Sequence, residues 1–274
     1  MIATFSLFSC QKDDGFSSRD ITYLDQAEVQ KRVEENGLTI TYADSSALND
    51  AICASVASFN QDKTVCVFGG SLSCCTESLY AKYLWAYYLN WHIFTYGMGG
   101  YGFSSLQGSI QNQVDHAKPA DIYILWASTN DYTNNREIGK PSDYTEADGY
   151  DQSKLTTQCG GMNYCIKKLQ KISPEAKIYV FGSLPFYQHE GGYMTETELR
   201  NELGHTFYQY IEAQQKVAEL HGLKFLNQFD IPVLTRESSA LYYQDDAFHM
   251  TEQGYANVGV YQLYFLATET EFNK

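Results

Sequence analysis

The chain has 274 residues, enough for one large domain with a substantial core, and 44% of them are hydrophobic. Its 33 acidic and 19 basic residues give a net charge of −14. Such a surface repels phosphate backbones and anionic lipid headgroups, so we exclude nucleic acid as a partner. The 23 tyrosines suit packed cores as well as clefts that face sugars, and we assign most of them to packing.

The first 22 residues are expected to form a signal remnant and a flexible tether, ahead of a single domain at 23–274. Nine small or apolar residues precede Cys10, and a polar run follows it. The stretch "LFSC" resembles the lipobox of bacterial lipoproteins, in which the cysteine carries the lipid, although the usual basic start is missing. The resemblance implies an exported protein at the periplasmic or cell-surface membrane, attached to it only through Cys10. A stray cysteine in a frayed terminus is the alternative, and the true start codon is left open.

The other six cysteines show neither the CxxC pairs nor the histidine spacing of a zinc site, so no metal is expected. Cys66 lies in an apolar stretch and is expected to be a small core residue. Cys159 and Cys165 are close enough in sequence to bridge a loop in an oxidising compartment. The sequence does not decide whether they do.

Short apolar strands alternate with helices along the rest of the chain. Strands are predicted at 38–42, 64–68, 92–96, 122–126, 178–181 and 223–226. Helices are predicted at 26–35, 46–58, 77–89, 106–116, 161–171, 196–221 and 251–267. A long polar loop is expected at 133–152. Alternation of this kind predicts an α/β domain with a doubly wound parallel sheet.

Chemistry-bearing residues follow the predicted strands, where ligands bind in open α/β sheets. The first core strand ends in "FGGS", which places Ser71 behind two glycines. The next strand runs into "GMGGYG", and the third into "STND". Before the last helix comes "DAFH", in which Asp246 precedes His249 by three residues. Each stretch alone also fits an ordinary feature, such as a helix N-cap for Ser71, a turn or a loop.

Together these residues fit a serine hydrolase. A serine hydroxyl needs a base within hydrogen-bond reach, which His249 can supply, and a carboxylate such as Asp246 holds that imidazole in the right tautomer. The developing oxyanion needs preorganised donors. The backbone N–H groups of Ser71 and Gly100 and the side-chain amide of Asn130 can supply three.

The four stretches resemble the conserved blocks of the SGNH hydrolases, also called GDSL esterases and lipases, over residues 64 to about 265. The resemblance implies a flavodoxin-like three-layer α/β/α sandwich and hydrolysis of acyl esters without a cofactor. It implies Ser71 as the nucleophile, Asp246 and His249 as its partners, and Gly100 and Asn130 as oxyanion donors. Gly99 or Gly102 can take the place of Gly100 in this assignment.

Two positions depart from the family pattern. Gly70 stands where the family's GDS motif has aspartate, and Ser128 stands where its GxND motif begins with glycine. Neither change removes a catalytic group, but Gly70 alters how the turn before Ser71 can be braced. Two facts disfavour the ordinary α/β-hydrolase: Ser73 stands where G-x-S-x-G needs a glycine, and Asp246 and His249 lie three residues apart instead of on separate loops.

The expected substrate is a small ester or an acylated glycan, with O-acetyl groups on carbohydrate favoured. Asp131, Asn134 and Tyr144 lie in or near the polar loop and are candidates for binding this substrate, although a plain solvated loop fits equally well. Lipid esters (a lipase or lysophospholipase) and thioesters suit the same superfamily. A non-catalytic glycan-binding surface lipoprotein is the alternative from another class. The oligomeric state is not readable from the sequence.

Overall fold

The computed structural model describes residues 16–40, 46–58, 62–104, 108–144, 152–186, 199–235 and 237–270. Cys10, the candidate lipid attachment point, lies outside the described residues. The domain is built on a sheet of six strands in the order β1-β3-β2-β4-β5-β6. The strands are β1 (Thr22–Tyr23), β2 (Thr64–Gly69), β3 (His92–Thr95), β4 (Ile122–Trp126), β5 (Lys177–Phe181) and β6 (Lys224–Leu226).

Strands β2 to β6 are parallel, and β1 pairs antiparallel with β3 at one edge. The parallel strands follow the doubly wound, flavodoxin-like order, in which the second strand lies on one side of the first and the later strands on the other. All five residues of β4 are buried. A parallel strand with both faces covered needs such a continuous apolar run, and the sequence "IYILW" supplies it.

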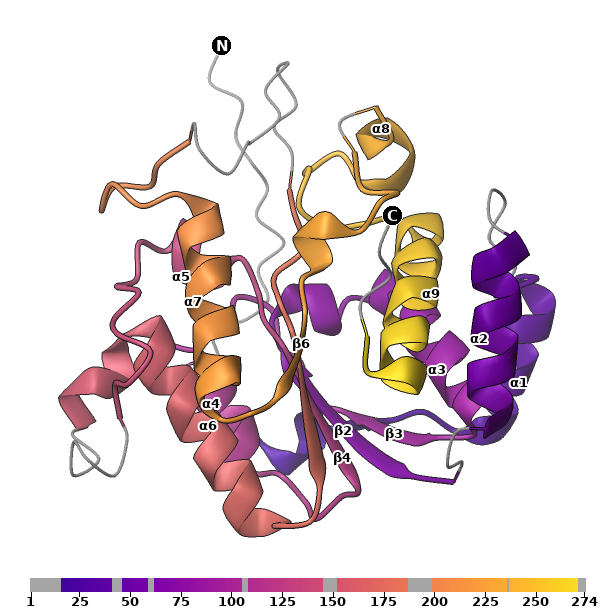
Figure 1. Ribbon diagram of the computed structural model, residues 1–274, viewed down its shortest axis with the longest axis horizontal. Helices are drawn as coiled ribbons and strands as arrows, with labels where there is room; N and C mark the ends of the chain where they lie inside the picture. The colour runs from indigo at the N-terminus through magenta and orange to yellow at the C-terminus, as the bar shows by residue number, and fades with distance from the viewer. Residues whose placement is uncertain are drawn as a thin grey trace.

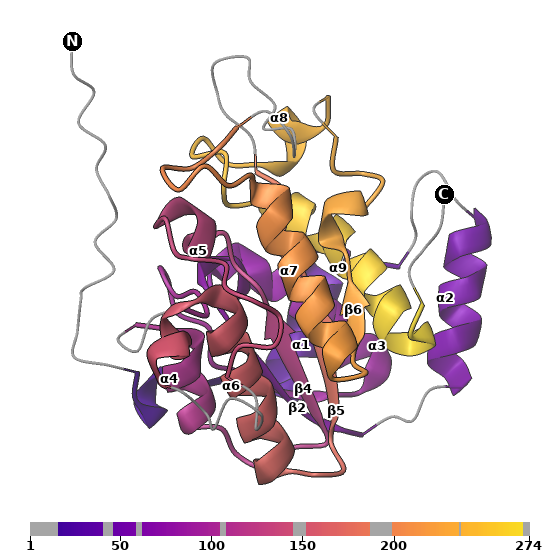
Figure 2. The ribbon, with the colours of Figure 1, turned by 60° about the vertical axis from the view of Figure 1, so that its left-hand side comes forward.

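Helices cover both faces of the sheet in a three-layer sandwich (Figures 1 and 2). One face carries α1 (Gln26–Glu35), α2 (Ser46–Ser58), α3 (Leu79–Leu89) and α9 (Glu252–Thr268). The other carries α4 (Ile110–Asp115), α6 (Gln158–Ile172) and α7 (Phe207–Leu220). Alternate residues of β2 divide between the two cores, with Val65 and Val67 on the first face and Cys66 and Phe68 on the second. The predicted fold class is confirmed.

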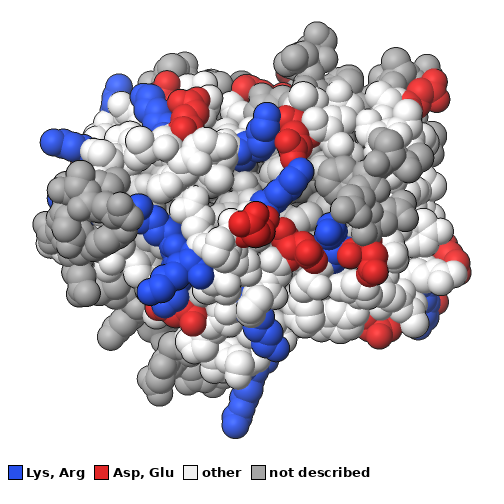
Figure 3. Space-filling model, turned by 60° about the horizontal axis from the view of Figure 1, so that its bottom comes forward, with Lys and Arg blue, Asp and Glu red and all other residues white. Residues whose placement is uncertain are grey.

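Short elements fill the connections. Helices α5 (Asn130–Thr133) and α8 (Ser239–Tyr242) lie toward the top in Figure 1, beyond the carboxyl ends of the strands. Single 3-10 turns form at Ser18–Asp20, Ser71–Ser73, Thr76–Ser78, Gln152–Thr156 and Gln228–Asp230. The face at the amino ends of the strands comes forward in Figure 3, where basic and acidic side chains intermingle. Lys63 and Asp121, which precede β2 and β4, form one ion pair there at 3.7 Å.

The predicted tether was wrong in its last residues. Phe16 is only 5% exposed and its ring stacks on Tyr96, while Thr22 and Tyr23 form β1 against β3. The described part of the domain therefore begins at Phe16. A two-residue edge strand has no periodicity of its own, so the sequence offered no signal for it.

Two predicted elements were also wrong in extent. Leu38 to Ile40 form no strand, although both end residues are buried as alternation required, and the rest of 38–42 lies outside the described residues. The helix predicted at 196–221 begins only at Phe207. Thr206 caps it through a reciprocal capping box with Gln209, and Gly204 has a φ of +80°, which ends any helix before it.

None of the described cysteines forms a disulfide; they are Cys53, Cys66, Cys74, Cys75, Cys159 and Cys165. Cys159 and Cys165 lie six positions apart on α6, a rise of ~9 Å, which is too far for a disulfide. Among the described residues, no helix combines the length and the apolar character needed to cross a membrane.

Candidate active site

Ser71 and Asn130 follow neighbouring strands at the point where the sheet reverses its winding. The chain passes from β2 to β3 on one side and then crosses back to β4 on the other. Gly69 pairs in register with Trp126, so β2 and β4 end at the same level. A doubly wound sheet opens its ligand crevice at this position.

The turn that carries Ser71 is held tightly from behind. The side-chain amide of Gln113 on α4 clamps the backbone of Gly69, accepting from its N–H at 2.9 Å and donating to its carbonyl at 2.8 Å. Ser73 donates to the Gly70 carbonyl through its N–H at 3.0 Å and its hydroxyl at 2.8 Å. A β-carbon on Gly69 would meet the Ser73 hydroxyl at 2.5 Å. Glycine is therefore required at Gly69 for close packing.

Asn130 lies directly against the residue before Ser71. A β-carbon on Gly70 would lie 2.8 Å from the Asn130 amide nitrogen and 2.6 Å from the Tyr101 carbonyl. The Asn130 amide donates to the Tyr101 carbonyl at 3.0 Å and to the Ser128 hydroxyl at 3.2 Å. To act as an oxyanion donor, the amide must exchange one of these contacts for the oxyanion. Any side chain at Gly70 would collide with the Tyr101 carbonyl, so the packing of this turn requires glycine there.

Asp131 has a structural role as a buried, fully hydrogen-bonded carboxylate. Its carboxylate is buried and accepts from the N–H groups of Phe103 at 2.8 Å and Ser104 at 3.0 Å, and from the Ser104 hydroxyl at 2.6 Å. Burial raises the pKa of Asp131 although these hydrogen bonds oppose it. The carboxylate binds the segment directly after the glycine-rich loop (residues 97–102) to α5, and neither of its own oxygens is exposed. This geometry does not support a substrate contact by Asp131.

The glycine-rich loop divides into a packed part and an open part. Gly102 lies against the Asp131 carboxylate, where a β-carbon would come within 2.6 Å of an oxygen. Gly100 is exposed, has a φ of +81° and has open space around it. Gly102 therefore serves packing, while Gly99 and Gly100 remain as the candidates for the backbone oxyanion donor.

Asp246 and His249 are joined as a hydrogen-bonded pair. The Asp246 carboxylate lies 2.5 Å from Nδ1 of His249, and its other oxygen accepts from the backbone N–H groups of Phe248 and His249, both at 2.9 Å. Burial opposes ionisation of Asp246, but the hydrogen bonds from the His249 ring and the two amides outweigh it and lower the pKa of the carboxyl group. An ionised Asp246 fixes the imidazole with Nε2 turned away from it, as a general base requires.

Contacts on both sides fix the loop that carries this pair. Tyr243 pairs with Met250 across the base of the loop, and the Tyr243 hydroxyl donates to the Pro185 carbonyl at 2.6 Å. The Phe248 ring stacks on Phe186 with centroids 4.7 Å apart. Phe186 in turn contacts Tyr132, two residues after Asn130, at 6.0 Å. A line of rings thus links the segment of Asn130 to the segment of His249.

The Ser71 turn and the segment after His249 also meet. The Cys75 thiol lies 3.3 Å from the Tyr255 hydroxyl in the first turn of α9. Among the described residues, neither the Ser71 hydroxyl nor Nε2 of His249 has a hydrogen-bond partner. The hydrogen bond between them that a working triad needs is not formed here, and such contacts often tighten only when substrate binds.

The family of the chain follows from a comparison with protein-family models. The model of the GDSL-like lipase/acylhydrolase family matches residues 67–256, which is more than half of the chain. The chain belongs to this family. The matched span includes Ser71, Asn130, Asp246 and His249. No curated protein matches the chain.

Solved structures with the same fold include other GDSL-like proteins. A Lactobacillus plantarum protein is 16% identical with a TM-score of 0.62, over 76% of this chain and 98% of its own. A Bacteroides ovatus protein described as a GDSL-like lipase is 13% identical with a TM-score of 0.54, over 76% and 99%. A catalytic mutant of an acetylxylan esterase from Geobacillus stearothermophilus is 12% identical with a TM-score of 0.52, over 78% and 97%. At these identities the likeness concerns the fold.

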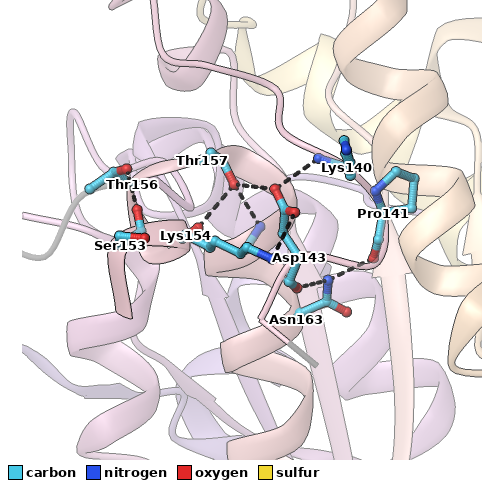
Figure 4. Close-up of polar contacts among 9 residues, drawn as sticks. Lys140, Pro141, Asp143, Ser153, Lys154, Thr156, Thr157 and Asn163 are labelled. Atoms are coloured by element: carbon cyan, nitrogen blue, oxygen red, sulfur yellow. Dashed lines mark hydrogen bonds and ion pairs between the residues drawn. The ribbon is translucent and has the colours of Figure 1, made fainter. Parts of the chain in front are cut away.

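In this GDSL-like protein the polar loop after α5 is anchored to α6 (Figure 4). The buried Asp143 carboxylate accepts from the Lys140 N–H at 2.8 Å and the Thr157 hydroxyl at 3.3 Å, and the Lys154 ammonium lies 3.9 Å away. The Asn163 amide donates to the Pro141 and Asp143 carbonyls. This part of the loop is therefore a packed structure on the side of α6.

Two candidate substrate residues lie in different parts of this region. The Tyr144 ring packs on Tyr164, halfway along α6 and well below its first turn. Asn134 is exposed at the end of α5, four residues after Asn130. Asn134 is therefore placed closer along the chain to the proposed oxyanion donor, whereas Tyr144 belongs to the packing of the loop.

Sequence reasoning missed Gln113, Ser73, Phe186 and Phe248, all of which hold the candidate site residues in place. Glutamine and serine at these positions belong to no recognisable motif, and both bind backbone atoms of the turn before Ser71. Among the described residues, no group of three His, Cys, Asp or Glu side chains could hold a metal ion.

Proposed function

We propose that this protein is a serine esterase that hydrolyses short O-acyl esters, with O-acetyl groups on carbohydrate as the substrate class. The main support is the hydrogen-bonded Asp246–His249 pair, in which the carboxylate oxygen lies 2.5 Å from Nδ1. The chain is GDSL-like, and its Ser71 directly follows the central strand β2. Ser71 attacks the ester carbonyl while Nε2 of His249 takes its proton. Asn130 and the N–H groups of Ser71 and Gly100 stabilise the oxyanion.

The acyl-enzyme that forms is then resolved by water. His249 returns its proton to the leaving alcohol as the first carbon–oxygen bond breaks. A water molecule next gives a proton to His249 and attacks the acyl carbon; the bond from that carbon to the Ser71 oxygen then breaks, His249 returns the proton to this oxygen, and the carboxylic acid leaves. The exposed side-chain amide of Asn134 suits hydroxyl groups of a sugar better than an acyl chain.

Exposed apolar residues favour a second candidate, the hydrolysis of longer lipid esters or thioesters. Leu241 on α8 is 64% exposed, and the partly exposed Phe248 stands beside His249. Leu199 and Leu203 are also exposed in the segment that packs near α5, where the Leu199 carbonyl accepts from Tyr132. An apolar chain lying across such residues would be stabilised.

A series of p-nitrophenyl esters from two to ten carbons separates the two candidates. Each buried CH₂ contributes ~0.8 kcal/mol, or roughly fourfold in kcat/KM. We expect kcat/KM to be highest for acetyl or propionyl and to fall beyond butyryl, with Ser71→Ala as the blank. A rise through eight carbons assigns the protein to lipases or thioesterases. No turnover of any ester, together with binding of acetylated glycans, favours the non-catalytic alternative.

We also propose that the protein is exported and lipid-anchored through Cys10. The support is the "LFSC" stretch and the polar run after it. Cys10→Ser should release the protein from membranes in its native host and abolish labelling by radioactive fatty acid. Labelling that persists in the variant would contradict the anchor.

A further inference from the structure

Lys82 on α3 is buried completely, which is rare for lysine. Its ammonium donates to the Ser73 carbonyl at 2.5 Å and to the Ser78 hydroxyl at 3.0 Å. Among the described residues, no carboxylate lies within ion-pair distance of it. A charge inside a protein without a counter-ion is costly, so an apolar side chain would suit this position better if packing were its only role.

Ser73, which Lys82 contacts, fixes the turn around Ser71. The N–H and hydroxyl of Ser73 both donate to the Gly70 carbonyl. Its own carbonyl accepts from Lys82 and, more weakly at 3.4 Å, from the Thr95 hydroxyl. A movement of Ser73 therefore moves Gly70 and Ser71 with it.

The surroundings of Lys82 make its charge sensitive to pH. Burial lowers the pKa of Lys82 to about 8. The groups that face it are the thiols of Cys74 and Cys75 on the turn, and Tyr255 of α9 lies behind Cys75. Burial raises the pKa of Cys75 and that of Tyr255, so these two stay protonated while Lys82 loses its proton.

We propose that Lys82 is a positioning residue for Ser71, whose ammonium holds the Ser73 carbonyl and Ser78 hydroxyl and thereby fixes the turn that presents the nucleophile. The proposal rests on the proposed function, because it takes Ser71 as the nucleophile. The ammonium form holds the turn best, since hydrogen bonds from a charged donor are about twice as strong as neutral ones. Lys82 itself does not touch the substrate.

The test compares Lys82→Met with the wild type and with Lys171→Met, which removes an exposed lysine at the end of α6. At pH 7 we expect Lys82→Met to lower kcat for an aryl acetate ~10-fold with KM unchanged, because the ammonium's hydrogen bonds to the Ser73 carbonyl and the Ser78 hydroxyl are both lost. The gap should close between pH 7 and 10 as the wild type loses its own proton. Lys171→Met should follow the wild type throughout.

Three results would overturn the proposal: full kcat in Lys82→Met at pH 7, a deficit that stays constant from pH 6.5 to 10, or a change in KM alone. A purely structural lysine would give the constant deficit. Should Lys82→Met fail to fold, Lys82→Gln retains a neutral donor and is expected to show a smaller deficit at pH 7, which also closes as the wild type loses its proton.

A second measurement does not depend on esterase activity. Amide hydrogen exchange at residues 71–78 should be faster in Lys82→Met than in Lys171→Met, while exchange in α6 stays equal. Should the wild type hydrolyse no ester, the proposed function fails, and this exchange experiment still decides whether Lys82 holds the turn. Unchanged exchange at 71–78 would refute its positioning role.

Discussion

The turn that carries Ser71 is braced by fully buried polar groups, whereas the loop that carries Asp246 and His249 is held by its own backbone, by the buried rings of Tyr243 and Phe186 and by the partly exposed ring of Phe248. Ser73, Gln113 and Lys82 behind the turn are all 0% exposed. The side chains of Asp246 and His249 are 45% and 29% exposed. We conclude that damage to the turn should lower activity and stability together, while damage to the loop should lower activity alone.

The largest effect is expected where the two regions must act together. His249→Ala should lower kcat by ~10³-fold or more, because Ser71 loses its base. The double variant with Ser71→Ala should be hardly worse than either single variant, and Asp246→Asn should be milder than both. Steady-state kinetics on an aryl acetate measure this. Additive losses for Ser71 and His249 would show that the regions do not form one catalytic unit.

Asn130 lies against the turn, and we expect it to stabilise the transition state as an oxyanion donor. Asn130→Ala should lower kcat ~10²-fold and change KM little, since an oxyanion donor acts mainly once charge develops. The comparison of kcat with KM across substrate concentrations provides the test. An effect confined to KM would assign Asn130 to substrate binding in the ground state.

Gly70→Ala probes the packing of the turn itself. The new β-carbon would lie 2.6 Å from the Tyr101 carbonyl and 2.7 Å from the Ser128 β-carbon, so the backbone must shift. We expect about 1–3 kcal/mol of lost stability, measured by urea unfolding, and roughly tenfold lower kcat. Unchanged stability and activity would mean that the turn can accommodate a β-carbon at Gly70 and is less tightly packed than these distances indicate.

Phe248→Ala probes the loop, and the smallest effect is expected. Loss of the stacking on Phe186 should reduce kcat about 2- to 10-fold, since such a pair contributes ~0.5–1.5 kcal/mol, while labelling of Ser71 by a fluorophosphonate slows similarly. The melting temperature should stay close to that of Tyr87→Ala, which removes an exposed aromatic pair on α3. A large drop in stability would erase the contrast between loop and turn.

Local patterns in the sequence were sufficient to predict the strands next to the candidate site. The apolar run at 64–68 and the stretch at 122–126 became β2 and β4 nearly residue for residue, because buried parallel strands must be continuously apolar. The pairing of Asp246 with His249 was also predictable, since three residues of one turn bring the two side chains together.

Features that depend on distant contacts were not predictable. The pairing of β1 with β3, the contact of Lys82 with Ser73 and the stacking of Phe248 on Phe186 all join segments that no local rule relates. The start of α7 was placed too early because 196–206 reads as helical, and the local capping box of Thr206 and Gln209 was overlooked. Asp131 was misread for a related reason, since its burial is a property of the packed loop.

The most direct test of the central claim is turnover by Ser71→Ala. The wild type should hydrolyse p-nitrophenyl acetate and take up one fluorophosphonate per chain, on the peptide that contains Ser71. Ser71→Ala should keep the wild-type melting temperature, lose the label and lose at least ~10³-fold in kcat. A folded Ser71→Ala variant that keeps a tenth of wild-type turnover would show that Ser71 is not the nucleophile.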